Sequence, residues 1–552
     1  MTSPIVDLKG RSPWSVLPPL VLGFFMIMVD TTIVNIAVPS IQKGLDANIT
    51  DVGWVNSGYL LSFAVLMLPA GRLGDRYGPR ALFVSGLVLF TLASAACGLA
   101  GSIGFLIGAR VVQGVGAAML TPQTMAVITR VFPPKNRGAA LGIWGMVAGL
   151  ATIAGPVLGG LLVETWGWEW IFYVNIPVGV VALIWAVATV PHLETHKRYF
   201  DVVGTVLAVA GLFLLIFGLQ EGETYDWGTI TGPVSIWSLI GAGVVVLGVF
   251  VYRQHRLGER ALLPLRLFHY RNFSLANVSA FMISFAMLGI FFPLVIFLQS
   301  ILGLSPLQAA LVNLPASLLS GVVAPFAGRL SDRINGKWVV ATGFGFIAVS
   351  LVLVYSVLSP DVSEATLVWC MIPFGFGTGL VFSPMVNLAT AGLDHRTAGA
   401  GAGAFNTIRQ VGSVVGSAAI VAMLTGRLAG AIPDAARSIA PTLPSQLQAP
   451  FANIFAGGGL STDTIQQGFQ PPAGVSGNAA KQLGAAAQQA VGDGFTVAVK
   501  DTLLLVVAAL VIGGVAALFM SPTRRASDAA AESGGERDDV ASGEAEGQPA
   551  AV

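Results

Sequence analysis

Two short stretches decide the fold of this chain: GRLGDRYGPR at residues 71–80 and GRLSDRINGK at residues 328–337. Each follows a long apolar segment and leads into another, and the second copy has one extra residue before its last glycine. The regions 114–122 and 375–384 also share a Gly-x-Gly…Pro pattern. Internal repeats of this kind are typical of membrane transporters whose two halves rock about a central site. The sequence therefore predicts two similar halves.

The composition indicates that lipid surrounds most of the chain. Its 552 residues are 54% hydrophobic and only 10% charged, whereas soluble domains carry about 25% charged residues. A helix needs about 20 apolar residues to cross a bilayer. Fourteen segments meet this requirement: 16–38, 51–71, 81–100, 104–128, 139–163, 170–190, 202–219, 234–252, 273–300, 306–328, 338–358, 365–390, 398–424 and 501–520.

Arginine and lysine predict the orientation of these segments. The turns after even-numbered segments are basic, as in Arg72, Arg76 and Arg80, whereas the alternate short turns hold only Lys43. Because cytoplasmic loops are enriched in positive charge, we expect both termini to be cytoplasmic, in a cell membrane crossed many times.

The repeat divides the chain into consecutive parts. We expect a cytoplasmic N-terminus at 1–15, a six-helix half at 16–190, a central extra helix pair with its loops at 191–272, five helices of the second half at 273–424, an extracytoplasmic loop at 425–500 with a short helix at 479–491, a last helix at 501–520 and a disordered cytoplasmic tail at 521–552.

Asp30 and Arg110 are charged residues that lie inside otherwise apolar segments. A charge at membrane depth costs at least about 3 kcal/mol, so it usually faces a cavity and is functional. Both residues lie about 10 Å below the predicted outer surface, which allows them to meet. Burial favours a protonated acid, whereas a nearby guanidinium favours the carboxylate. We therefore expect Asp30 to exchange protons along an aqueous path, or to bind a cationic substrate, with Arg110 tuning it. The alternative is a static ion pair that only fixes helix packing.

With these motifs in order, the chain resembles the major facilitator superfamily, specifically its 14-helix drug:proton antiporters. The stretch at 71–80 is similar to the family's loop signature. The rest of the resemblance is carried by DTTIVNIAVP at 30–39, by Arg110, Gln113, Gly114 and Gly116, by Gly142, Gly155, Pro156, Gly159 and Gly160, and by WEWIFYVNIP at 168–177. In the last stretch, Glu169 stands where a basic residue is usual.

The resemblance implies an all-α polytopic fold with two six-helix halves and a central extra helix pair. It also implies a secondary active exporter of amphipathic drugs or metabolites, driven by proton antiport and acting as a monomer in the lipid bilayer. We expect no cofactor, no metal and no enzymatic activity. The chain has no Gly-x-x-x-x-Gly-Lys-Ser/Thr nucleotide loop. Its five histidines all fall in predicted cytoplasmic turns, and a net charge of +1 gives no indication of nucleic-acid binding.

Two further groups of residues have expected roles: a set of loop residues and the glycines and proline of the fifth segment. A charged latch is expected to join the halves when the site faces outward; the alternative is that its arginines only set orientation. The predicted latch residues are Gly71, Arg72, Asp75, Arg76, Gly78, Arg80, Arg137 and Asp332. In the fifth segment, Pro156 is expected to kink the helix, and Gly142, Gly155, Gly159 and Gly160 to let another helix approach closely, either as a seal or as ordinary packing.

The substrate pocket is predicted from aromatic and polar residues at membrane depth. Its members are Phe24, Asn35, Trp54, Tyr59, Gln123, Trp144, Phe285, Asn313, Phe374, Asn387, Asn406 and Arg409. Rings together with Asp30 favour a lipophilic cation. For Arg409 the alternative is hydrogen bonding to helix carbonyls. Two other functions remain open: a proton-coupled importer of a small solute, and a non-transporting receptor on the same fold.

Overall fold

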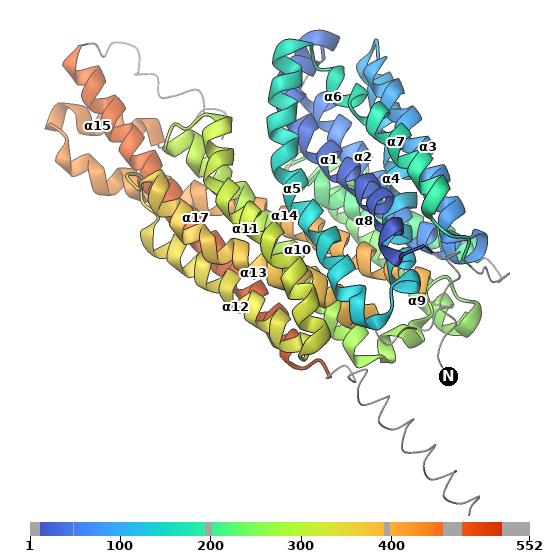
Figure 1. The fold of residues 1–552 in the computed structure, drawn as a ribbon. Coiled ribbons are helices and arrows are strands. Elements are labelled where there is room, and N and C mark those ends of the chain that lie inside the picture. The colour runs from blue at the N-terminus through green and yellow to red at the C-terminus, as the bar shows by residue number, and fades with distance from the viewer. Residues whose placement is uncertain are drawn as a thin grey trace, which may run out of the picture.

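The computed structural model describes residues 11–47, 49–193, 201–222, 224–390, 393, 398–455 and 477–521. Nearly all of them are helical (Figure 1). The described strands are β1 (Thr229–Thr231) and β2 (Val234–Ser235), which pair antiparallel.

The first half begins with the 3-10 helix η1 and continues through seven α-helices. These are η1 (Pro13–Val16), α1 (Leu17–Leu45), α2 (Ile49–Tyr77), α3 (Pro79–Gly98), α4 (Ile103–Val131), α5 (Pro134–Thr165), α6 (Trp170–Tyr173) and α7 (Asn175–Thr189). The central pair is α8 (Val202–Gln220) and α9 (Ile236–Leu257), followed by η2 (Gly258–Arg260) and η3 (Leu265–His269).

The second half repeats the arrangement. Its elements are α10 (Arg271–Ile296) with the π-helical η4 (Phe297–Ile301), α11 (Pro306–Arg333), α12 (Gly336–Val357), α13 (Glu364–Thr390), α14 (Ala398–Ile439), η5 (Ala440–Thr442), α15 (Ser445–Phe455) and α17 (Asn478–Leu518).

The helices match the predicted spans. In the described part of the chain, 13 helices are long and apolar enough to cross a membrane. The remaining predicted span, 139–163, lies in α5, which is 32 residues long. The predicted all-helical fold of two halves and a central pair is therefore confirmed.

The repeated loop motif is mostly helix. α2 continues to Tyr77, and only Gly78 separates it from α3. Gly78 has a φ of 98°, a value that favours glycine, and Pro79 then occupies the first turn of α3, where its missing N–H costs nothing. This glycine and proline reverse the chain within one residue.

The two halves lie side by side, and their helices diverge toward the end that carries α15 (Figure 1). We call this the α15 end, and the opposite end, where α1 begins and α2 ends, the Asp75 end. Toward the Asp75 end, the Ser383 hydroxyl of α13 donates to the Gly138 carbonyl of α5 at 3.0 Å. The backbones of Met67 and Leu68 in α2 also approach Gly403 of α14. The halves are thus packed together at the Asp75 end.

The central pair packs against both halves. Leu212 and Ile216 of α8 share a cluster with Leu61 of α2 and Val414 of α14. Asp201 ties α8 to α9, because it accepts hydrogen bonds from Arg253 at 2.9 Å and Gln254 at 3.0 Å. Burial alone would raise the pKa of Asp201, but these bonds and the Gly204 amide hold that pKa below its usual range.

The segment predicted as a loop at 425–500 is largely helical where the structure describes it. α14 is 42 residues long and α17 is 41. At 1.5 Å per residue each spans about 60 Å, twice the hydrocarbon core of about 30 Å. α15 packs on these extensions through Phe451, Phe455, Ile432 and Leu483. The predicted helix at 479–491 is shorter than the observed one, because α17 runs from Asn478 to Leu518. Residues 456–476 and the predicted tail from 522 lie outside the described residues.

Candidate functional site

Asp30 of α1 lies in a buried polar cluster between three helices. Its Oδ2 accepts from Arg110 Nη1 of α4 at 2.5 Å. Its Oδ1 accepts from Gln113 Nε2 at 2.8 Å and from Asn175 Nδ2 of α7 at 3.1 Å. Asp30 and Arg110 are both 0% exposed, and Asn175 is 3% exposed. The contact that equal depth predicted is present, and Asp30 has no solvent-exposed surface in this conformation.

Arg110 is held on several sides. Its Nε donates to the Val55 carbonyl at 3.0 Å, and Nη1 also donates to Gln113 Oε1 at 2.8 Å. The guanidinium carbon lies 4.1 Å from the centre of the Tyr59 ring. Arg110 Nη2 has no hydrogen-bond partner among the described residues. The pair is therefore nearly, but not completely, satisfied in a site from which water is excluded.

Sequence reasoning missed the outer layer of this cluster. Asn175 also donates to Ser94 Oγ at 3.1 Å, and Ser94 donates to the Phe172 carbonyl at 2.9 Å. Cys97 Sγ lies 3.6 Å from Gln113 Oε1. Asn175 was visible in the stretch 168–177 as an amide at membrane depth, whereas nothing in the sequence marks Ser94 or Cys97 as its neighbours.

Asp75 joins the two halves. Its Oδ2 accepts from the backbone N–H of Ala400 at 3.0 Å, in the first turn of α14. Its Oδ1 accepts from Arg130 of α4 at 3.0 Å. A carboxylate at a helix N-terminus is favoured by the helix dipole. Arg72 lies 3.8 Å from Asp75 and also donates to the Ala261 carbonyl at 3.0 Å. The loop after the central pair is therefore joined to the Asp75 contact as well. Arg130 is not among the predicted latch residues.

Three other predicted latch arginines make contacts within the first half. Arg80 contacts His192 and donates to the Val187 carbonyl at 2.7 Å, both within the first half. Arg137 donates to the Thr129 carbonyl at 2.6 Å, and Arg76 is exposed over the Tyr77 ring. Gly71 lies where α2 meets α14, since its Cα is 3.4 Å from a Cβ built at Gly403. The side chain of Asp332 lies outside the described residues.

The glycines of α5 face two different helices. A Cβ at Gly142 would lie 2.6 Å from Pro325 Cα of α11, in the other half. A Cβ at Gly155 would overlap Thr32 of α1, and one at Gly159 would lie 2.9 Å from Ile33 Cγ1. A Cβ at Gly160 would meet nothing within 4 Å, so Gly160 does not serve the predicted close packing. Pro156 lies within α5, but its side chain is outside the described residues.

Several predicted pocket residues are used for packing. Gln123 donates to the Ala70 carbonyl of α2 at 2.9 Å and is fully buried, so it joins α4 to α2 rather than lining a cavity. Tyr59 is buried against Arg110. Phe24 stacks on Trp144 with ring centres 4.3 Å apart. Trp54 lies 5.5 Å from Phe217 of α8.

The remaining predicted pocket residues are spread over both halves. Asn35 is exposed and accepts from Asn56 at 3.2 Å. Phe374 lies edge-on to Phe291, and Phe285 is buried with its backbone against Gly416. Asn387 is half-buried.

Six buried polar atoms of the predicted pocket lack a hydrogen-bond partner within the described residues. They are Tyr59 Oη, Gln123 Oε1, Trp144 Nε1, Asn313 Oδ1, Asn406 Oδ1 and Arg409 Nε. The amide nitrogens of Asn313 and Asn406 each donate to a carbonyl four residues earlier. Buried polar groups are normally satisfied, so these atoms are suited to water or a ligand.

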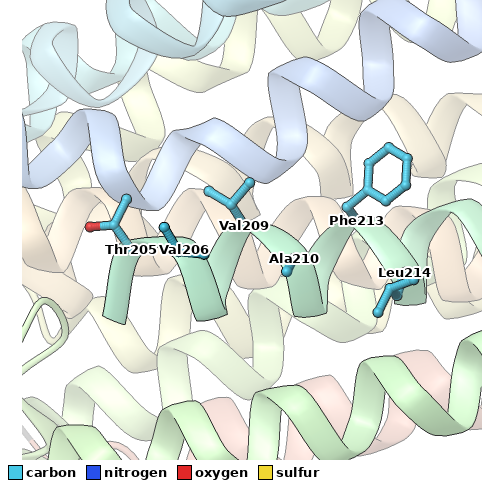
Figure 2. Close-up of a pocket in the computed structure, with 6 residues that line it drawn as sticks. All are labelled: Thr205, Val206, Val209, Ala210, Phe213 and Leu214. Carbon is cyan, nitrogen blue, oxygen red and sulfur yellow. The ribbon is translucent and has the colours of Figure 1, made fainter. Parts of the chain in front are cut away.

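An open hollow lies along α8. Figure 2 shows its lining, which runs from Thr205 to Leu214. The hollow measures about 410 Å³. Its lining offers one hydroxyl and no charge, so it lacks the convergent polar groups that orient a ligand.

Comparisons with known proteins show which proteins this chain is similar to. Residues 20–417 match the family described as Major Facilitator Superfamily. The Uncharacterized MFS-type transporter Rv1250 of Mycobacterium tuberculosis is 45% identical over 423 residues, covering 77% of this chain and 72% of that protein. The Tetracenomycin C resistance and export protein of Streptomyces glaucescens is 33% identical over 434 residues, covering 78% and 79%. The solved human organic anion transporter MFSD10 (TETRAN) is similar in fold, with a TM-score of 0.54 at 14% identity, covering 91% of this chain and all of that one.

Proposed function

Because this chain belongs to the major facilitator superfamily and is a multi-pass membrane transporter rather than an enzyme, we propose that it exports amphipathic drugs or metabolites in exchange for protons. The observation that carries this proposal is Asp30, a carboxylate with no exposed surface that is paired with a single arginine. The relative that confers resistance by exporting tetracenomycin C supports the direction of transport.

Proton coupling follows from the chemistry of the pair. While Arg110 donates to Asp30, the guanidinium balances the negative charge of a carboxylate at this position. If a conformational change separates the two, a lone carboxylate in a poorly solvated site favours the protonated form. Loading and release of a proton at Asp30 would then alternate with the tilt of the halves.

α5 provides a route between that tilt and Asp30. One part of α5 packs on α11 of the second half at Gly142, and another packs on α1 at Gly155 and Gly159. The α1 partners Thr32 and Ile33 lie two and three residues after Asp30. A displacement of the second half would therefore be transmitted through α5 to α1, the helix that carries Asp30.

The Asp75 contact defines the conformation. The halves are joined at the Asp75 end by Asp75 and the Ala400 amide, and the basic turns support a cytoplasmic location for that end. We take the conformation to be outward-facing, in a monomer with both termini cytoplasmic and lipid around its exposed apolar helices. A reporter fused to either terminus should be accessible from the cytoplasmic side only.

The proposal is tested by flux in inverted membrane vesicles, with tetracenomycin C as the probe. We expect the probe to accumulate inside the vesicles when their interior is made acid, and the accumulation to collapse when an uncoupler is added. Proton-driven flux in the opposite direction would identify an importer. Binding of the probe without any flux would identify a receptor.

The glycines of α5 supply a matched pair of variants. Gly142→Ala places a methyl group against the backbone of α11, and such overpacking costs about 1–3 kcal/mol. We expect it to lower the export rate about tenfold or more. Gly160→Ala adds the same methyl group where nothing lies within 4 Å and should transport like the wild type. Equal export rates for the two variants in vesicles would contradict the idea that export depends on close packing of α5 against α11 at Gly142.

A further inference from the structure

α14 carries a polar stripe. Asn406, Gln410, Ser413 and Ser417 follow one another at steps of four, three and four residues, which places them on one face of the helix. Arg409 lies beside this face. The opposite side of the same helix carries Val411 and Val415.

The packing of α14 shows where this stripe points. Gly412 and Gly416 receive the backbones of Phe281 and Phe285 in α10. Gly403 receives the backbone of α2, a helix of the first half. The polar residues therefore lie between a helix of their own half and one of the other half.

The peripheral helix α8 covers the other side of α14. Val414 and Val411 pack with Leu212 and Ile216 of α8. Arg409 is two residues from Val411, which is about 200° around the helix. Arg409 thus faces away from α8, on the side of α14 that lies between the polar stripe and the glycines that receive α10.

The charge of Arg409 has no counterpart. The side chain is half-buried, and its Nε has no hydrogen-bond partner within the described residues. No ion pair to Arg409 occurs in that part of the chain either. Asn406, one turn away, is fully buried with Oδ1 unpartnered. An isolated charge is costly at membrane depth unless water or a ligand solvates it.

Asp30, in contrast to Arg409, is fully paired. Its two oxygens already accept from Arg110, Gln113 and Asn175, so in this conformation it offers nothing to a cationic substrate. The expectation of a lipophilic cation rested on aromatic rings together with Asp30, and in this conformation the Asp30 oxygens are already engaged. The unmatched charge on α14 is positive.

We propose that Arg409 binds an anionic oxygen of the exported substrate, such as a carboxylate or a phenolate, with Asn406 accepting from a hydroxyl of the same molecule. This rests on the proposed export function and assigns its substrate class. A guanidinium presents several donors to such an oxygen, and charge-assisted hydrogen bonds are the strong ones.

Two dyes with the same xanthene core and opposite charge provide the test. Fluorescein is anionic near neutral pH and rhodamine 123 is cationic. Binding of each dye to the purified full-length protein is measured by fluorescence polarisation. We expect wild-type protein to bind fluorescein at least about tenfold more tightly than rhodamine 123.

Three variants locate the effect. Arg409→Gln should weaken fluorescein binding about tenfold, as expected for the loss of one hydrogen bond to a charged group. Arg409→Lys keeps the charge and should restore most of the affinity, which separates recognition from folding. Arg427→Gln is the control, because Arg427 lies on the same helix but is 58% exposed and paired with Asp501; its fluorescein affinity should match the wild type.

Failure of wild-type protein to bind fluorescein, a preference for rhodamine 123, or unchanged affinity in Arg409→Gln would each overturn the assignment. Proton-driven flux of tetracenomycin C in vesicles is measured separately. If that flux occurs while the dye results are negative, only the substrate class is wrong. If the dye results hold without any proton-driven flux, the export function is wrong and the anion site remains.

Discussion

Asp30→Asn is expected to abolish proton-driven export completely. The amide has nearly the same shape and can still accept from Gln113 and Asn175 at Oδ1, but it cannot carry a proton. Accumulation of tetracenomycin C in inverted vesicles should therefore not respond to an imposed pH gradient. Exchange of labelled for unlabelled probe, which needs no net proton movement, should persist.

This variant needs a control for folding, since it leaves Arg110 buried without a counter-charge. Breaking a buried ion pair costs about 3–5 kcal/mol. Retained exchange and a normal amount of protein in the membrane would show that the fold survives. Asp361→Asn removes an exposed carboxylate in the turn between α12 and α13 and should leave coupled export intact. Full proton-driven export by Asp30→Asn would end the idea that this acid is the proton carrier.

Asp75→Asn is the second change with a large expected effect. It removes the charge that balances Arg130 and Arg72, both buried, and weakens the contact with the Ala400 amide. An energy of about 3 kcal/mol shifts a conformational equilibrium by about a hundredfold. We expect export to fall at least about tenfold, and hydrogen exchange to rise at the ends of α2 and α14 that meet here.

A surface ion pair is the matched comparison. Asp434 and Arg437 pair at 2.7 Å on the exposed part of α14, where such pairs contribute about 0–1 kcal/mol. Asp434→Asn should leave both export and hydrogen exchange near the wild-type values. If Asp75→Asn gave the same pattern as Asp434→Asn, the Asp75 contact would have no role in holding the halves together.

The sequence predicts well how deep a residue lies in the membrane, but it predicts poorly which neighbouring helix its side chain faces. Asp30 and Arg110 could be paired because each is the charged residue of its apolar segment and their depths agree. Gln123 also lies at membrane depth, but its side chain turns toward Ala70 of α2, and depth alone does not reveal this. The motif glycines look equivalent in the sequence, yet Gly142 touches the other half and Gly160 touches nothing.

The helical extensions escaped prediction for a different reason. Residues 425–500 are rich in Ala, Gly and Gln, so they lack the hydropathy that marks a membrane span. Their helices are stabilised by tertiary contacts, such as those of Phe451 and Leu483, between segments that are distant in the sequence. Such contacts become visible only once α14 and α17 are known to lie side by side.

The length of α14 turns small tilts into large displacements. The helix runs without a break from the contact with Asp75 to Ile439, a distance of about 60 Å. A rotation of about 10° about its inner end would sweep its outer tip through about 10 Å. In the orientation proposed above, fluorophores attached to that tip and to α6 would follow each transport cycle from outside the cell. A binder that clamps the tip would be expected to arrest the cycle without occupying the substrate path.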